Sequence, residues 1–293
     1  MKQVGLCLMA LWLWAGAAPG GSYDSFAAGV TANVRDQYDD AIENFGVALG
    51  APDLPASYRP SAYRGRALAY LKTQRCKEAL ADLASAAALN PPAIEDVILS
   101  AKSKLCLKDI PGALKDFETI TSSAPDAEFY WKFGVYLWME GAFDEANKHF
   151  FASAGQLKRN FKHPSAGYIV LWYAITADRL HTLDLAKLDD LTGTIDVLTH
   201  GNWPAPILDI YLKKNYAEKI YSRLGDKDAP EYAGKKCEAD FYLSQWNLMH
   251  VGEDAAKKTL ASALKQCPHT YLEYEAAVSE AERLSLPLPK GDE

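Results

Sequence analysis

Small and bulky apolar residues recur along this chain at a fixed interval. In each set, a second small residue follows the first by twelve positions, and a bulky apolar residue follows four positions after that. The second small residue advances from position 79 to 113 and then to 146, which are steps of 34 and 33. The three sets are Ala67, Ala79 and Leu83; Ala101, Ala113 and Phe117; and Gly134, Ala146 and Phe150.

A period of this length with these columns is typical of tetratricopeptide repeats, which are helical hairpins. Two antiparallel helices approach closely only where the facing residues are small, and the bulky residue fills the gap beside them. Gly29 with Ala41 supplies an earlier copy, and Ser244 with Ala256 supplies a later one. Because one hairpin cannot bury its own apolar face, the hairpins are expected to stack. An irregular all-helical bundle with chance alanines is the alternative.

The predicted fold is therefore all-α: a tetratricopeptide-repeat solenoid of antiparallel helical hairpins, with an irregular helical insert and a C-terminal capping helix. The repeat columns are lost after residue 160 and return near 237, and the last helix carries an apolar stripe suited to capping. The expected segments are a signal peptide at 1–17, N-terminal repeats at 18–160, an irregular helical segment at 161–236, a C-terminal repeat with its capping helix at 237–284, and a disordered tail at 285–293.

The first residues predict export. Lys2 precedes an apolar run from Val4 to Trp14, and Ala15-Gly16-Ala17 offers a cleavage site for a secretory signal. The run is short for a bilayer span, although retention as an uncleaved anchor stays open. Leu6 precedes Cys7, where a lipidation signal needs a small residue, so the sequence argues against a lipid anchor. A soluble exported product is expected.

Export makes disulfide bonds plausible for the remaining cysteines. The two expected pairs, Cys76 with Cys106 and Cys237 with Cys267, are each separated by 30 residues and fall at neighbouring helix ends in the repeat register. Closing such a loop is worth about 3 to 4 kcal/mol in the chain-entropy treatment. Buried thiols, or a different pairing, are the alternatives.

The sequence shows no catalytic, metal-binding or cofactor-binding motif. Its six histidines have no metal-ligand spacing, and it has no GxSxG, phosphate-binding glycine loop or CxxC. The net charge is −7, and no basic cluster is interleaved with aromatic residues, which argues against nucleic acid. We expect a protein that is not an enzyme and holds no metal or cofactor.

The sequence therefore favours a function in binding other proteins through a surface of the repeats. In repeat arrays of this kind, positions 2, 5, 9, 12 and 13 of the first helix of each unit line the inner face. The residues expected in such a protein-binding groove are Glu128, Trp131, Val135, Trp138 and Met139 in one unit, and Phe241, Gln245 and Leu248 in the last. The alternative is that this strip packs on the chain's own irregular helices or on a second copy in a homodimer.

Four segments of the C-terminal half carry a more specific resemblance. "GYIVLWYAITADRL", "NWPAPILDIYL", "CEADFYLSQWNLM" and "CPHTYLEYEAAVSEAERL" occur in this order. Over about residues 125 to 285 the chain resembles the new lipoprotein I (NlpI) family of bacterial envelope proteins. The resemblance implies a helical, often dimeric adaptor that acts in the periplasm of a bacterial envelope and brings substrates, such as cell-wall hydrolases, to a C-terminal-processing serine protease. It implies no catalytic residue, and the cysteine pairs and Leu6-Cys7 depart from the family pattern.

Two other roles stay open at this point. Assembly factors of a pilus or a secretion machine share the repeat fold, so the fold alone does not separate them from adaptors. A glycan-binding or glycan-processing protein is a weaker alternative, suggested by the seven tryptophans and the export signal.

Overall fold

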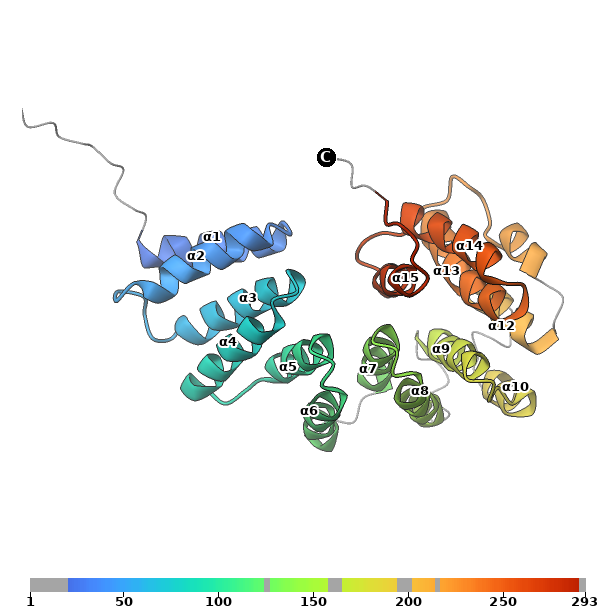
Figure 1. Ribbon diagram of the computed structural model, residues 1–293, viewed down its shortest axis with the longest axis horizontal. Helices are drawn as coiled ribbons and strands as arrows, with labels where there is room; N and C mark the ends of the chain where they lie inside the picture. Colours follow the sequence, from blue (N-terminus) through green and yellow to red (C-terminus); the bar gives the residue numbers. More distant parts are fainter. Residues whose placement is uncertain (1–20, 124–126, 158–164, 194–201, 214–216, 290–293) are drawn as a thin grey trace, which may run out of the picture. The chain divides into compact units, whose positions relative to one another are not determined.

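The computed structural model describes residues 21–123, 127–157, 165–193, 202–213 and 217–289, and every regular element within these ranges is a helix (Figure 1). The predicted all-α class is confirmed. The helices are α1 (Ser22–Val34), α2 (Tyr38–Gly50), α3 (Arg59–Lys72), α4 (Cys76–Leu89), α5 (Ile94–Cys106), α6 (Ile110–Ser123), α7 (Ala127–Met139), α8 (Phe143–Leu157), α9 (Ala166–Arg179), α10 (Leu185–Gly193), α12 (Ala205–Lys213), the 3-10 helix η1 (Ala217–Arg223), α13 (Tyr232–His250), α14 (Glu253–Gln266) and α15 (Leu272–Arg283).

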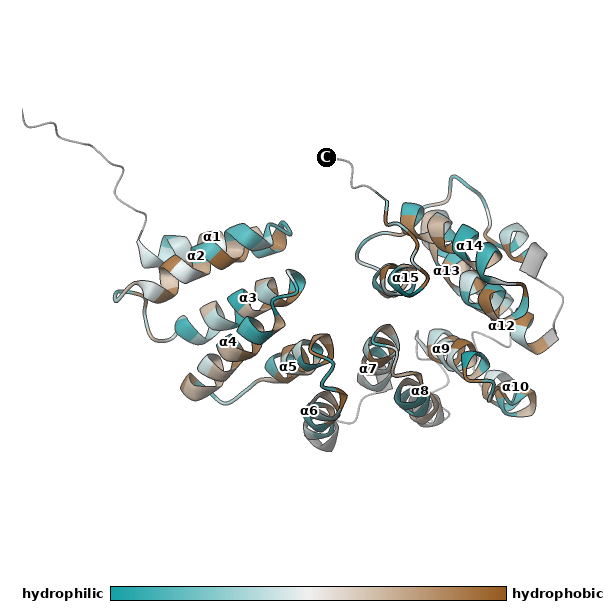
Figure 2. Ribbon diagram, in the orientation of Figure 1, coloured by the Kyte–Doolittle hydropathy of each residue, from teal (hydrophilic) through white to brown (hydrophobic). Residues whose placement is uncertain are grey.

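The chain forms two compact units, Met1–Leu99 and Ser100–Glu293, called unit 1 and unit 2 below. In unit 1, α1 packs on α2, α2 on α3, and α3 on α4, so consecutive hairpins stack. In unit 2, α7 pairs with α8, α8 packs on α9, and α13 pairs with α14. Consecutive packed hairpins are the arrangement expected of an all-α repeat solenoid. The labelled helices carry both hydrophobic and hydrophilic residues (Figure 2).

The repeating small residues let bulky side chains sit between helices. Phe45 of α2 is 1% exposed. A Cβ atom added to Gly29 of α1 would lie 2.9 Å from Cδ1 of Phe45, and one added to Gly65 of α3 would lie 2.4 Å from its Cζ. Phe45 therefore occupies the space that two missing side chains leave, and it joins the first hairpin to the second.

A second repeated feature lies in the turns between paired helices. In five hairpins the turn contains a residue with positive φ, from 56° to 79°, and the next backbone N–H bonds to the carbonyl five residues before it. This is the Schellman arrangement, which satisfies the last carbonyls of a helix. The same turn closes α9, so the predicted irregular segment begins with a hairpin of the regular type. The five residues are Asp36, Gln74, Lys108, Gly141 and His181.

One of the two predicted disulfide bonds is confirmed. Cys237 in the first part of α13 and Cys267, directly after α14, are bonded, with their Cα atoms 4.7 Å apart. The bond ties the start of one helix to the end of its antiparallel neighbour, as the repeat register predicts. Cys76 begins α4 in unit 1 and Cys106 ends α5 in unit 2, and their pairing stays a prediction.

Two expectations about the termini are outside the part of the chain that the structure describes. The predicted signal peptide, 1–17, lies outside the described residues, as does the end of the predicted tail at 290–293. Among the described residues, no helix combines the length and apolar character that a membrane crossing requires.

Candidate functional site

The predicted groove residues of α7 lie in the core of unit 2. Val135 and Trp138 are fully buried, Trp131 is 7% exposed, and Met139 is partly buried. Glu128 lies outside the residues whose side chains the structure describes. The α7 strip is therefore an internal packing surface at its described positions.

Helices from later in the chain provide that packing. The Trp138 ring lies 5.4 Å from the ring of Trp172 in α9 and 5.9 Å from that of Phe241 in α13, both in edge-to-face orientation. Such aromatic pairs add about 0.5 to 1.5 kcal/mol beyond their buried area. Phe241 is fully buried and Gln245 is 5% exposed, whereas Leu248 is partly buried. The structure thus brings predicted groove residues of α7 and α13 into contact with each other, and they form part of the hydrophobic core of unit 2.

The C-terminal helix α15 covers the end of α7. Ser279 Oγ and Arg283 Nη1 both donate hydrogen bonds to the Met139 carbonyl, at 2.5 and 2.7 Å. The Arg283 guanidinium lies over the Trp138 ring, 4.7 Å from its centroid. These contacts agree with the alternative drawn from the sequence, in which the α7 strip packs on other helices of the same chain.

A buried ion cluster fixes this end of α15. Arg179 of α9 donates two hydrogen bonds to the carboxylate of Glu280, at 2.7 and 3.0 Å, and Arg283 Nε donates a third at 2.8 Å. The Glu280 side chain is fully buried. Arg179 also donates to Gln245 Oε1, at 3.2 Å. Burial lowers the pKa of Arg283, and the charge of Glu280 opposes that shift.

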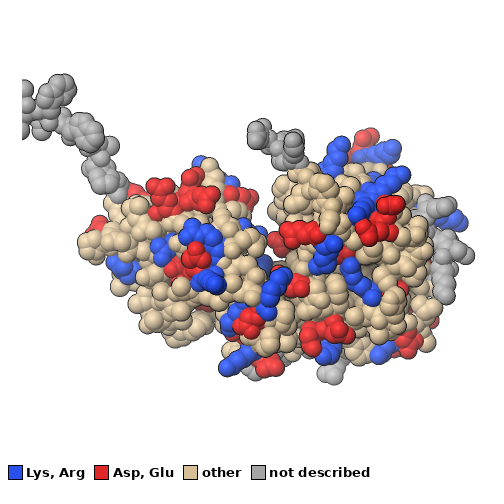
Figure 3. Space-filling view, in the orientation of Figure 1, with Lys and Arg blue, Asp and Glu red and all other residues tan. Residues whose placement is uncertain are grey.

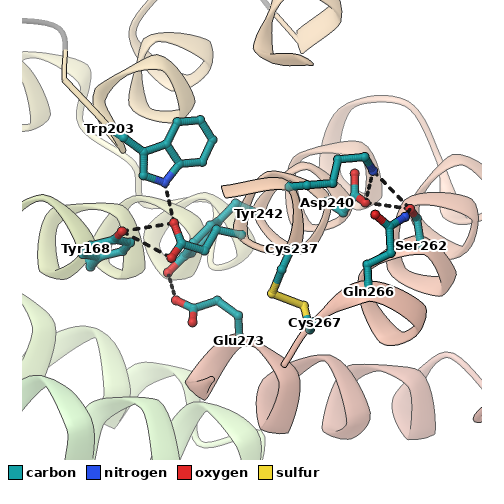
Figure 4. The surroundings of a disulfide bond; sticks show 11 residues. Tyr168, Trp203, Cys237, Asp240, Tyr242, Ser262, Gln266, Cys267 and Glu273 are labelled. Carbon is teal, nitrogen blue, oxygen red and sulfur yellow. Dashed lines mark hydrogen bonds and ion pairs between the residues drawn. A yellow bond between two sulfur atoms is a disulfide. The ribbon is translucent and has the colours of Figure 1, made fainter. Parts of the chain in front are cut away.

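The other end of α15 takes part in a cluster of carboxyl and aromatic groups. The Glu238 carboxylate of α13 accepts hydrogen bonds from Tyr168 of α9, at 3.0 and 3.3 Å, and from the Trp203 indole. Tyr242, one turn further along α13, donates to Glu273 of α15 at 2.8 Å. Figure 4 shows Tyr168, Trp203, Tyr242 and Glu273 gathered beside the Cys237–Cys267 disulfide bond. Glu238 and Glu273, called the carboxyl pair below, are 9% and 6% exposed.

The surroundings of the carboxyl pair favour protonation. Burial, and then the negative charge of Glu273, raise the pKa of Glu238 to about 7. Burial also raises the pKa of Glu273. The hydrogen bonds from Trp203 and Tyr168 to Glu238, and the charge of Lys235, act in the opposite direction on its pKa but are weaker.

A third polar cluster lies on the neighbouring face of α13. Asp240 is fully buried and accepts hydrogen bonds from Tyr221 of η1 at 2.7 Å and from Ser262 of α14 at 2.6 Å. Lys236, one turn earlier, forms an ion pair with the same carboxylate. The residues of Glu-Ala-Asp-Phe-Tyr-Leu, which begins at Glu238, thus hold α13 to its neighbours on all sides.

These clusters can hold helices together. Because their carboxylates are buried, a ligand has little access to them. Each carboxylate accepts hydrogen bonds from protein groups, and Glu238, Asp240, Glu273 and Glu280 are at most 9% exposed. Within the described ranges no group of three or more His, Cys, Asp or Glu residues is placed to hold a metal ion. The expectation that the protein is not an enzyme, and has no cofactor, stays a prediction.

An exposed counterpart of the buried strip lies on α1. With Gly29 aligned to Gly134, the five inner-face positions of α1 are occupied by Tyr23, Phe26, Val30, Asn33 and Val34, and the four apolar residues among them are called the α1 strip. Tyr23 is 52% exposed, Val30 is 43% exposed and Val34 is 80% exposed, whereas Phe26 is partly buried. Apolar side chains that recur on one helix face at this exposure are a feature of interaction surfaces.

The first hairpin around this strip is acidic. Residues 21–50 contain five acidic side chains and one basic side chain, Arg35. Acidic atoms gather over α1 and α2 in Figure 3. Arg64 stands at a corresponding inner-face position of α3, and its charge is engaged by Asp96. The exposed acidic residues are Asp24, Asp36, Asp39, Asp40 and Glu43.

No protein-family model matches the chain, and no curated protein matches its sequence. The repeat assignment therefore depends on the period and on the stacked hairpins described above. The likeness to the new lipoprotein I family depends on the sequence segments alone.

Proposed function

We propose that this protein is an exported helical-repeat scaffold that binds other proteins through the α1 strip. The observation that carries the proposal is the exposure of Tyr23, Val30 and Val34 on α1, whereas Val135, the α7 counterpart of Val30, is fully buried and Met139, the counterpart of Val34, is partly buried. In unit 2, residues at these positions are covered by α9, α13 and α15. In unit 1, Tyr23, Val30 and Val34 of α1 are exposed to a partner.

The dimensions and charge of the α1 strip define the partner. Tyr23 to Val34 spans eleven residue steps, or about 16 Å of helix, which matches three turns of a partner helix. An amphipathic helix that presents apolar residues at i, i+3, i+4 and i+7 fits such a face. The acidic hairpin favours a partner whose apolar residues are flanked by Lys or Arg, since complementary charge speeds encounter and sets orientation.

The most specific role that we propose is that of a periplasmic adaptor. In this role the protein holds an envelope substrate, such as a cell-wall hydrolase, next to a C-terminal-processing serine protease. Holding two partners together raises their effective concentration and needs no catalytic group in the scaffold. The resemblance of residues 125–285 to the new lipoprotein I family, the export signal and the Cys237–Cys267 disulfide bond support this role.

Affinity purification from envelope extract, followed by mass spectrometry, tests both levels of the proposal. Val30→Lys with Val34→Lys places positive charge on the strip, and Val47→Lys on α2 is the matched control, since Val47 is 55% exposed. Replacing two valines that the partner would cover, and adding positive charge opposite the partner's Lys or Arg, is expected to weaken binding by at least about tenfold.

We expect the control to recover a serine protease or its substrates, and the strip variant to lose them. Equal recovery by both variants would overturn the role of the α1 strip. Recovery of pilus or secretion components without a protease would replace the adaptor role by that of an assembly factor.

A further inference from the structure

The two ends of α15 are attached by different chemistry. Near its C-terminal end, the Glu280 carboxylate is balanced by two guanidinium groups, those of Arg179 and Arg283. Near its N-terminal end, Glu273 is held by a neutral donor, the Tyr242 hydroxyl. Only the N-terminal attachment places a second carboxylate, that of Glu238, in the same buried environment.

Polar and charged side chains from α9, from the segment before α12, and from α13 surround the carboxyl pair. Helix α9 contributes Tyr168, and the segment before α12 contributes Trp203; both donate to Glu238. Helix α13 contributes Tyr242 and Lys235, and Tyr271 precedes Glu273 at the start of α15. The Lys235 ammonium lies 3.6 Å from Glu231, and its side chain is 27% exposed. Among the described residues, therefore, no cation forms an ion pair with either member of the pair.

Two buried carboxylates without a cation cannot both be charged at low cost. Taking each charge out of water is unfavourable, and the two charges repel each other in a medium of low dielectric constant. A single proton bound by one of the two groups removes one charge and the repulsion. Burial and the charge of Glu273 place the pKa of Glu238 at about 7, which is within the range of ordinary growth media.

We propose that Glu238 and Glu273 form a proton-dependent latch for the N-terminal half of α15. With the proton bound, residues 271–278 are held against α13. When the proton is lost, repulsion between the two carboxylates loosens this half, while Arg179 keeps the C-terminal half attached to α9 and Arg283 keeps it attached to α7. The inference is independent of the α1 strip and of the proposed adaptor role.

The direction of the effect follows from the raised pKa. The native state binds the proton more tightly than the unfolded chain does, so this attachment is strongest at low pH. It weakens as the pH rises from the ordinary glutamate range through about 7. A glutamine at position 238 keeps an acceptor oxygen for Trp203 and Tyr168 but carries no charge at any pH, so it uncouples the latch from pH.

Hydrogen exchange measured by mass spectrometry at about pH 6 and about pH 8.5 tests the latch, after correction for the intrinsic pH dependence of exchange. We expect the protection of residues 271–278 to fall by about tenfold or more in the wild type. Residues 279–284 are expected to keep their protection. Glu238→Gln is expected to hold the protection of both peptides nearly constant, and Glu253→Gln, at an exposed glutamate, is the control and is expected to behave as the wild type.

Several results would overturn the inference. One is unchanged protection of residues 271–278 in the wild type between the two pH values. Another is a loss of protection in Glu238→Gln equal to that in the wild type, because the loss would then come from another group. A parallel loss in residues 279–284 would indicate general unfolding. If Glu238→Gln does not fold, Glu273→Gln provides the same comparison, and the wild-type measurement stands by itself.

Discussion

A Cβ atom added to Gly134 of α7 would lie 2.7 Å from Cε1 of Phe150 in α8. Phe150 is fully buried, and it also stacks on Trp172 of α9 with ring centroids 5.7 Å apart. The phenylalanine therefore uses the space at Gly134 to join two hairpins, as Phe45 does at Gly29 and Gly65. The small-and-bulky columns of the sequence are interhelical contacts.

Replacing Gly134 by alanine is expected to destabilise the protein. The added methyl group overlaps the Phe150 ring, which is packed on its other side by Trp172, and such overpacking costs about 1 to 3 kcal/mol. Gly155→Ala in α8 is the control, because a Cβ there meets nothing within 4 Å. Removing a helical glycine without a clash is expected to stabilise by about 0.5 to 1 kcal/mol. Urea unfolding of both variants measures the difference, and two changes of the same sign would contradict it.

Replacing Glu280 by leucine is expected to cost about 3 to 5 kcal/mol of unfolding free energy. The change leaves Arg179 and Arg283 facing each other without their shared counterion, in a site where Glu280 is fully buried. Glu282→Leu, at an exposed position of the same helix, is expected to change stability by less than about 0.5 kcal/mol. Chemical denaturation compares the two, and a Glu280→Leu protein as stable as the control would show that the cluster does not stabilise unit 2.

Removing the Cys237–Cys267 bond by a double serine substitution is expected to lower stability by about 2 to 4 kcal/mol. The bond closes a loop with a sequence separation of 30 and so restricts the unfolded chain. Thermal unfolding with and without reductant checks this, since reductant should lower the midpoint of the wild type more than that of the variant.

Peptide mapping without reduction should also recover Cys76 joined to Cys106. Free thiols at these positions, or a different partner, would contradict that pairing.

Acid is expected to destabilise the protein through His149. Burial lowers the pKa of His149 to about 4, and its ring lies 4.6 Å from that of Phe117 and 5.4 Å from that of Phe133. The unfolded chain binds a proton near the ordinary histidine pKa, about 6.5, so the native state loses stability as the pH falls from about 6.5 to about 4. His149→Phe keeps a ring and removes the titration.

The unfolding free energy at several pH values in this range measures that difference. The wild type should lose up to about 3 kcal/mol more than His149→Phe. Parallel curves for the two proteins would show that His149 does not titrate during unfolding.

Local patterns allowed much of this structure to be predicted. The columns that contain Gly29, Phe45, Gly134 and Phe150 describe contacts within a hairpin or between neighbouring hairpins, and the Cys237–Cys267 bond follows from the same register. Such contacts repeat with the sequence and are visible as a period. The regular turns were missed because Asp36, Gln74, Lys108 and His181 differ in type and share only their backbone conformation.

The sequence left open whether the α7 strip is a groove or a packing surface, because the residues that cover it come from far along the chain. Arg179 and Glu280 are 101 residues apart, and Met139 and Arg283 are 144 apart. No period links them. Glu238, Glu273 and Glu280 resemble the solvated glutamates of other helices in the sequence, and only the fold shows that they are buried. The exposed α1 strip could have been found by applying the inner-face positions to the first repeat.

Photocrosslinking at the α1 strip tests the central claim most directly. A photoreactive phenylalanine analogue replaces Val30 in one form of the protein and Val47 in another, and both forms are irradiated in cells that export them. The account predicts discrete crosslinked partners from position 30, with apolar residues and flanking Lys or Arg at the crosslinked sites, and few from position 47. Equal crosslinking from both positions, or none from position 30, would contradict it.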